Sequence, residues 1–197
     1  MIRPSAFREL TVAQQEEDAY KKKIRYYPLS AKPETTNGQE KQDMKIISGG
    51  QTGADRAALD AAIELGIPHG GWLPRGRITE DGPLAQHYCL QELDSYRYRD
   101  RTRKNVVESD ATLIVSSGPL TGGSALTEAL AIRYDRPCLH LNMEYYAIDS
   151  AVRTVEQWLS KHAVSVLNIA GPRAGSDEKI YETVRELVLR INWAGRA

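Results

Sequence analysis

Ser48-Gly49-Gly50-Gln51-Thr52-Gly53 is the stretch that decides the fold prediction for this chain. It follows a short apolar segment, residues 44–47, and leads directly into an alanine-rich segment, residues 54–65. The order of strand, glycine-rich turn and helix is typical of an α/β domain. Backbone N–H groups at the start of such a helix favour a bound anion, so the stretch also predicts a binding site.

Two further turns repeat this order: Leu120-Thr121-Gly122-Gly123-Ser124 and Ala170-Gly171-Pro172-Arg173-Ala174-Gly175-Ser176. A single glycine turn is explained by the need for positive φ. Three turns with interleaved hydroxyl residues instead favour one anionic or nucleotide-like ligand that all three contact.

The whole segment 44–197 alternates between apolar strands and helices. Strands are expected at 44–47, 70–73, 89–93, 111–116, 138–141 and 164–169, and helices at 54–65, 102–108, 124–134, 151–160 and 177–191. This alternation predicts a Rossmann-like three-layer α/β sandwich with a mostly parallel central sheet. Ligands bind such sheets at the carboxyl ends of the strands, where all three glycine turns are expected.

The first 43 residues differ from the rest because they are polar and lack a sustained period. Two interpretations stay open: a disordered tail, or an arm that docks through Ile24, Tyr26, Tyr27 and Leu29. The length of 197 residues and the hydrophobic content of 41% suit one domain, residues 44–197, preceded by this segment.

Charge and cysteine content exclude several classes of partner. The 26 basic and 26 acidic residues balance, so neither a nucleic-acid nor a membrane surface is expected. No apolar run reaches membrane-spanning length and no signal peptide is recognised, which favours a cytoplasmic protein with reduced Cys89 and Cys138. The four histidines have no metal-ligand spacing, so no protein-bound metal is predicted.

Three charged residues accompany the turns. Arg101 precedes the 111–116 strand and can pair with a phosphate, Glu128 lies early in the helix after Gly122-Gly123, and Asp55 lies in the first helix. For Arg101 and Glu128, solvated or capping roles stay equally open. The turns match neither the P-loop nor the G-x-G-x-x-G pattern.

The candidate ligand-binding residues come from the three turns and the charged residues beside them: Ser48, Gly49, Gly50, Gln51, Thr52, Gly53, Asp55, Arg101, Thr121, Gly122, Gly123, Ser124, Gly171, Arg173 and Ser176. Arg101 and Glu128 are the catalytic candidates if the protein is a hydrolase.

Five segments resemble the molybdenum cofactor carrier protein family, a circularly permuted branch of the superfamily of lysine-decarboxylase-like (LOG) phosphoribohydrolases. They are residues 46–60, 71–74, 101–106, 109–114 and 121–124, and the resemblance extends over about 44–191. Residues 171–176, with Tyr181 and Leu187, look like the first βα unit of LOG proteins, but here that unit comes last. The resemblance implies a Rossmann-like fold and a homo-oligomer, either a dimer or a tetramer.

The LOG resemblance also assigns possible catalytic roles. Arg101 matches the LOG arginine and Glu128 is the nearest match to the LOG glutamate, and these two groups act on the glycosidic bond of a nucleoside monophosphate. The chain departs from the LOG motifs: Thr121 replaces a proline, Ala125 and Leu126 replace Gly-Thr, and Thr102 replaces a lysine. These departures favour a binding protein over an enzyme.

The leading hypothesis is therefore a carrier of molybdenum cofactor (molybdopterin) or of a related pterin phosphate. Helix N-termini suit its anionic groups, and Asp55 or Glu128 can accept a hydrogen bond from its ring amino group. Two alternatives remain: a LOG-like hydrolase of nucleoside 5′-monophosphates, and a sensor of a nucleotide-derived ligand.

Overall fold

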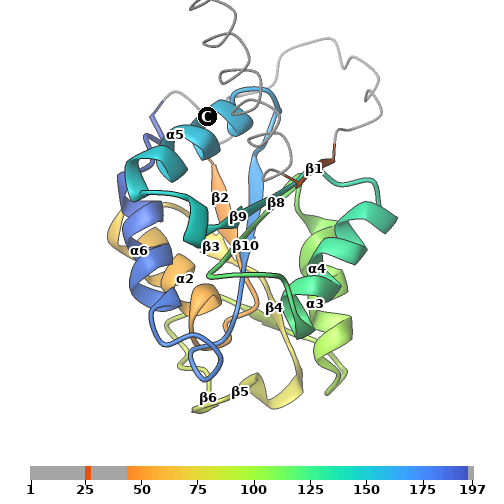
Figure 1. The fold of residues 1–197 in the computed structure, drawn as a ribbon. Helices are drawn as coiled ribbons and strands as arrows, with labels where there is room; N and C mark the ends of the chain where they lie inside the picture. Colours follow the sequence, from red (N-terminus) through yellow and green to blue (C-terminus); the bar gives the residue numbers. More distant parts are fainter. Residues whose placement is uncertain (1–24, 28–43, 195–197) are drawn as a thin grey trace, which may run out of the picture.

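The computed structural model describes residues 25–27 and 44–194 and centres on a six-stranded sheet (Figure 1). The strand order is β1 (Arg25–Tyr27), β9 (Cys138–Asn142), β8 (Ala111–Ser116), β10 (Val166–Ala170), β2 (Lys45–Ile47) and β3 (His69–Gly70). Five strands are parallel, and β1 pairs antiparallel with β9. The predicted α/β class with a mostly parallel sheet is confirmed.

The order of the parallel strands is that of a Rossmann sheet whose first βα unit has moved to the end of the chain. If β10 and the following helix α6 (Ile180–Arg190) are placed before β2, the parallel strands acquire the order 3-2-1-4-5 of a doubly wound Rossmann sheet. β10 is then the first strand, and the chain proceeds to β2 on one side of it and to β8 on the other. This reversal of direction is the switch point at which open α/β sheets bind ligands.

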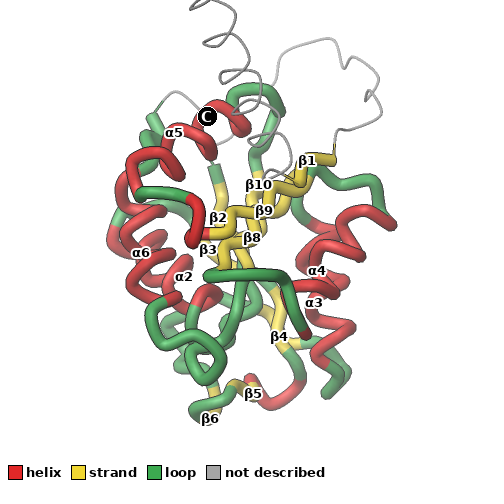
Figure 2. The backbone as a smooth tube through the Cα atoms, viewed as in Figure 1, coloured by secondary structure: helices red, strands yellow, loops and turns green. Residues whose placement is uncertain are grey.

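Helices cover both faces of the sheet (Figure 2). On one side are α2 (Ala54–Glu64), α5 (Ile148–Leu159) and α6, and on the other are α3 (Tyr98–Glu108) and α4 (Gly122–Arg133). β8 is buried along its whole length: Leu113 and Val115 join the core under α2, α5 and α6, whereas Ile114 joins the core under α3 and α4. This double burial explains its continuous apolar sequence.

The helices begin and end close to the predicted positions, with one exception. α3 begins at Tyr98, four residues before the expected start, because the charged segment 98–101 carries no apolar period. None of the helices in the described ranges has the length and apolar character needed to cross a membrane.

Residues 72–92 contain short ordered elements that lie outside the six-stranded sheet. β4 (Trp72–Leu73) pairs with β7 (Gln91–Glu92), and β5 (Ile78–Thr79) forms a hairpin with β6 (Gly82–Pro83). The 3-10 turns are η1 (Arg75–Arg77) and η2 (Met143–Tyr145). Arg77 orders the region because its buried guanidinium donates to four backbone carbonyls, those of Leu84, Ala85, Tyr88 and Leu90.

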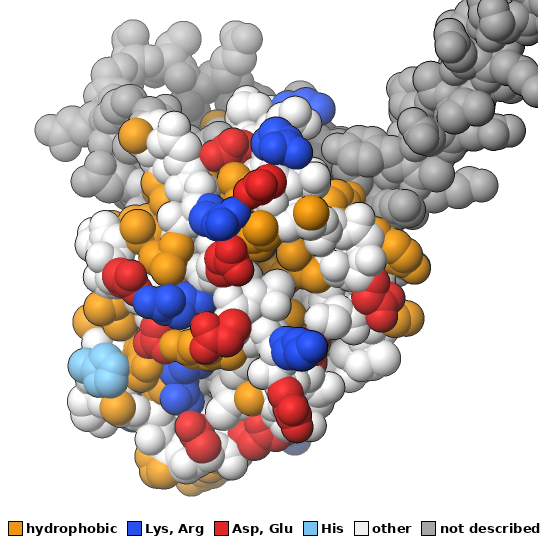
Figure 3. Space-filling view, turned by 60° about the vertical axis from the view of Figure 1, so that its left-hand side comes forward, with side chains coloured by type: hydrophobic (Ala, Val, Ile, Leu, Met, Phe, Trp, Pro, Cys, Tyr) orange, Lys and Arg blue, Asp and Glu red, His pale blue; other side chains and the backbone are white. Residues whose placement is uncertain are grey.

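In the N-terminal segment, residues 25–27 form the edge strand β1. The rest of the predicted tail or arm, including Ile24 and Leu29, lies outside the described residues. The surface on the α2–α5–α6 side mixes acidic and basic side chains (Figure 3). Ion pairs such as Arg185–Glu64 and Arg190–Asp149 lie there, in keeping with the balanced composition.

Candidate functional site

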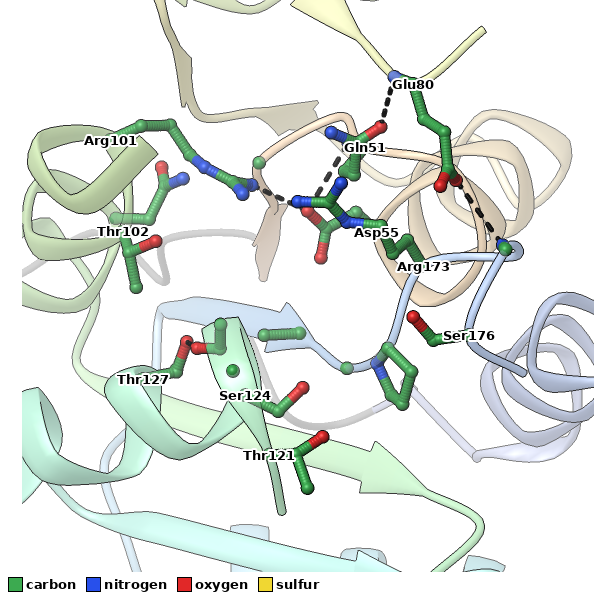
Figure 4. Close-up of a pocket in the computed structure, with 18 of the residues that line it drawn as sticks. Gln51, Asp55, Glu80, Arg101, Thr102, Thr121, Ser124, Thr127, Arg173 and Ser176 are labelled. Carbon is green, nitrogen blue, oxygen red and sulfur yellow. Dashed lines mark hydrogen bonds and ion pairs between the residues drawn. The ribbon is translucent and has the colours of Figure 1, made fainter. Parts of the chain in front are cut away.

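A pocket of about 400 Å³ lies at the carboxyl ends of β2, β8 and β10. All three predicted turns contribute to it, together with α3 and the β5–β6 hairpin (Figure 4). Its lining consists of Gly49, Gln51, Asp55, Glu80, Arg101, Thr102, Asn105, Thr121, Gly122, Gly123, Ser124, Thr127, Asn168, Ala170, Gly171, Pro172, Arg173, Gly175 and Ser176. The turns therefore meet at the switch point of the sheet.

Close backbone packing holds the β2–α2 and β10–α6 loops together. The Ser48 hydroxyl donates to the Ile169 carbonyl at 2.7 Å, and the Ala54 N–H donates to the Pro172 carbonyl at 3.1 Å. A Cβ at Gly53 would lie 2.6 Å from that same carbonyl oxygen, and Gly53 also has a φ of +74°. This position therefore requires glycine.

Eleven of the fifteen candidate ligand-binding residues line the pocket and four do not. Ser48 is buried and its hydroxyl donates to the Ile169 carbonyl, while Gly53 lies against the backbone of the β10–α6 loop. Gly50 faces the Leu84 and Leu90 side chains. The Thr52 hydroxyl donates to Glu80 Oε2 at 2.5 Å. These four residues build the wall of the pocket, and the ligand-binding role of the other eleven stays a prediction.

The N-termini of α2 and α4 differ in how many of their N–H groups already have partners. At α2, Ala54 N donates to Pro172, Gln51 N to the Asp55 carboxylate at 3.3 Å and Thr52 N to Gln51 Oε1 at 3.0 Å. At α4, the Ser124 and Ala125 N–H groups donate to the Thr121 carbonyl, and a Cβ at Gly122 or Gly123 would have no atom of the described residues within 4 Å. The backbone of Gly122 and Gly123 at the start of α4 is therefore open, and helix N-termini of this kind favour anions.

An ion pair crosses the opposite wall. Arg101 Nη1 donates to Asp55 Oδ2 at 2.7 Å, and the side chains are 14% and 7% exposed. Gly49 makes room for this pair, since a Cβ there would lie 1.3 Å from Arg101 Nη1. Two residues that lie 46 positions apart in the sequence are thus joined in the site.

Gln51 is 5% exposed, and two backbone donors fix its orientation. Its Oε1 accepts from Thr52 N and, at 2.7 Å, from Glu80 N. Its Nε2 has no hydrogen-bond partner among the described residues. A buried donor of this kind indicates a partner that the described residues do not supply.

Glu80 and Arg173 lie at the rim. The Thr52 hydroxyl, and to a smaller extent the Gly175 N–H and the Arg173 charge, hold the Glu80 pKa below its ordinary value. The Arg173 and Arg101 guanidinium carbons lie 5.7 and 5.9 Å from the Tyr98 ring centroid. Tyr98 therefore contacts Arg101 of its own helix, α3, and Arg173 of the β10–α6 loop.

Glu128 is not among the lining residues. It is buried in α4, and its charge adds to burial in raising the pKa of the Cys138 thiol to about 12. Thr127 lines the pocket in its place, with its hydroxyl donating to the Gly123 carbonyl at 2.9 Å. Of the two residues that the hydrolase hypothesis requires, Arg101 lines the pocket and Glu128 does not.

Sequence reasoning did not select five polar lining residues: Glu80, Thr102, Asn105, Thr127 and Asn168. Asn105 holds Trp72 by bonds to its backbone N–H and C=O, and Asn168 contacts Thr112 in the sheet. The one available signal was the polar Asn168 inside an apolar strand that ends at a glycine turn.

No cluster of three or more histidine, cysteine, aspartate or glutamate residues within the described part of the chain has metal-binding geometry. Neither cysteine lines the pocket: Cys89 is exposed elsewhere and Cys138 is buried. The described lining residues offer hydrogen-bonding groups and the Arg101–Asp55 ion pair.

Comparison with solved structures supports this description. A protein from Syntrophus aciditrophicus SB, described as "Putative molybdenum carrier protein", is 51% identical, with a TM-score of 0.74 over 77% of this chain and 98% of that chain. A diphosphate reductase of the non-mevalonate pathway is 11% identical with a TM-score of 0.34 over 76% and 60% of the two chains, too remote to carry an argument. No curated protein matches the chain significantly.

The sequence profile of the circularly permutated YpsA SLOG family matches residues 46–192. This range contains every residue that lines the pocket. It also agrees with the permuted strand order described above. The chain belongs to the circularly permutated YpsA SLOG family.

Proposed function

We propose that this protein is a binding and carrier protein for a small anionic pterin phosphate, with molybdenum cofactor as the cargo. The observation that carries the proposal is that one pocket has the open start of α4 on one wall and Arg101, Asp55 and Gln51 on the opposite wall. Its volume of about 400 Å³ lies in the range of small-molecule sites. The carrier description of the relative with 51% identity points to the same class of ligand.

The phosphate of such a ligand fits the start of α4. The Gly122 and Gly123 backbone is open there, and the hydroxyls of Thr121 and Ser124 line the same wall. Backbone N–H groups and the helix dipole both favour an anion at this position. The Ser176 hydroxyl approaches from the β10–α6 loop.

Two arginines fit a second anionic group, such as the metal–oxo end of the cargo. Arg173 is exposed at the rim and makes no ion pair of its own among the described residues, whereas Arg101 is paired with Asp55. No cysteine is available in the pocket, so the proposal does not include a thiolate bond to molybdenum.

The direct test is calorimetric titration of the full-length protein with metal-free molybdopterin and with molybdenum cofactor. We expect saturable binding of one ligand per chain at micromolar concentration. Gly123→Ala should weaken it at least about tenfold, because the methyl group enters the pocket. Arg103→Ala is the matched surface control, since Arg103 is exposed and lies outside the pocket. Absence of saturable binding to the wild-type protein would remove the proposal.

The placement of Glu128 favours a carrier over the hydrolase alternative. Incubation with a panel of nucleoside 5′-monophosphates distinguishes the two, since a hydrolase releases free base and a carrier does not. A sensor would instead change its oligomeric state on binding ADP-ribose-like compounds, which size-exclusion chromatography detects. The homo-oligomer and the cytoplasmic location remain part of the proposal.

A further inference from the structure

The orientation of the Gln51 amide is decided by its neighbours. Oε1 accepts from Thr52 N at 3.0 Å and from Glu80 N at 2.7 Å, so the opposite end of the amide must be the NH₂ group. That NH₂ group has no acceptor among the described residues, although Gln51 is 5% exposed and lines the pocket. Leaving a buried donor unpartnered is unfavourable, and a ligand oxygen would remove that penalty.

Asp55 offers the complementary group beside it. Its Oδ2 accepts from Arg101 Nη1 and from Gln51 N, while within the described chain no donor reaches Oδ1. Figure 4 shows the Asp55 carboxylate and the Gln51 side chain on the same wall of the pocket. A fixed N–H donor and a carboxylate oxygen acceptor thus stand side by side.

We propose that Gln51 and Asp55 together recognise the 2-amino-4-oxopyrimidine edge that pterins and guanine share. The Gln51 NH₂ group donates to the ring oxo group, and Asp55 Oδ1 accepts from the ring N–H and the exocyclic amino group. An adenine-type edge presents an amino group to Gln51 and offers Asp55 no equivalent donors. This inference rests on the proposed function and names the part of the ligand that this wall selects.

The inference also orients the ligand. Thr121 and Ser124 lie on the wall opposite Gln51 and Asp55 in Figure 4, where α4 begins. The phosphate therefore lies at Gly122 and Gly123, and the ring lies against Asp55. Substitutions on the two walls should have separable effects.

The experiment measures the affinity of the full-length protein for metal-free molybdopterin, GMP, IMP and AMP by calorimetry. IMP differs from GMP only by lacking the 2-amino group. We expect GMP to bind about tenfold more tightly than IMP, because a hydrogen bond to a charged group is lost. AMP should bind about a hundredfold more weakly than GMP, since both contacts are lost.

Two variants separate recognition of the ring from general damage. In Asp55→Asn the carbonyl oxygen remains opposite Arg101, so the new NH₂ group faces the ligand amino group. The GMP-to-IMP ratio should then fall to about one. Gly123→Ala, on the phosphate wall, should weaken GMP and IMP by the same factor and preserve their ratio. Thermal unfolding of each variant confirms that the fold is retained.

The outcomes distinguish this inference from the proposed function. Absence of GMP binding, equal affinity for GMP and IMP, or an Asp55→Asn variant that still discriminates between them overturns the inference. If molybdopterin binds and Asp55→Asn binds it equally well, the carrier function stands without this contact. If GMP discrimination depends on Asp55 but molybdopterin does not bind, the ring recognition stands and the natural ligand is a guanine nucleotide.

Discussion

Arg101 and Asp55 form an ion pair across the candidate site, with Nη1 donating to Oδ2 at 2.7 Å. They come from α3 and α2, on opposite faces of the sheet, and both side chains line the pocket. Gly49 leaves the space that the guanidinium occupies. The pair therefore joins the two helical layers at the point where a ligand is proposed to bind.

Gly49→Ala should displace Arg101. The added Cβ would lie 1.3 Å from Nη1, a distance that forces the guanidinium away from Asp55. We expect the free energy of unfolding to fall by about 1–3 kcal/mol, and ligand affinity to fall as well. Chemical denaturation measures the first quantity. Gly123→Ala is the control for stability, since its Cβ would meet no atom of the described residues within 4 Å. Equal stability of Gly49→Ala and wild type would contradict the assigned contact.

Glu128→Gln should leave ligand affinity within about twofold of wild type, because Glu128 does not line the pocket. The glutamine keeps the size of the side chain and removes its charge. Calorimetric titration checks the affinity, and thermal unfolding checks the fold. A large loss of binding with an intact fold would mean that Glu128 reaches the ligand after all and would revive the hydrolase hypothesis.

Thr52→Val should raise the Glu80 pKa. The Thr52 hydroxyl is the largest cause of the lowering in the folded protein, so its removal returns the pKa toward the ordinary value of 4.5. The stability that this bond contributes is present above that value and is lost as the pH falls through the lowered folded-state pKa. NMR titration of the Glu80 carboxyl measures the shift. An unchanged pKa in the variant would show that the Gly175 N–H and Arg173 dominate.

Cys89 should react with iodoacetamide at mildly alkaline pH, while Cys138 should not. Cys89 is exposed, whereas burial and the Glu128 charge raise the Cys138 pKa from 9.0 to about 12. The Cys138 thiol holds its proton more tightly in the folded protein than in the unfolded chain. Its contribution to the free energy of unfolding is therefore fully present below pH 9.0 and is lost as the pH rises toward about 12. Mass spectrometry of the labelled peptides measures both reactions, and rapid labelling of Cys138 in folded protein would contradict its burial.

The meeting of the three turns was predictable because strand polarity alone determines it. Residues 48–53, 120–124 and 170–176 each follow an apolar strand, and the carboxyl ends of parallel strands share one edge. Nine of the eleven predicted residues that line the pocket belong to these turns and follow from that rule, whereas Asp55 and Arg101 lie in the helices α2 and α3. The sequence could not show that the α2 end is already satisfied by Pro172 and Asp55, since both bonds depend on loop packing.

Other features depend on geometry that no sequence period encodes. Glu80 reaches the site from the turn between β5 and β6, and strands of two residues leave no alternating pattern in the sequence. Glu128 follows Thr127 by a single residue, yet only Thr127 lines the pocket. A difference of one helical position is smaller than the uncertainty of a predicted helix start.

The most direct test of the central claim is a crystal structure of the full-length protein with metal-free molybdopterin. We predict its phosphate at the backbone of Gly122 and Gly123, and its pterin edge against Gln51 and Asp55. A ligand bound away from the edge where β2, β8 and β10 end would contradict the claim that the three turns form one binding site.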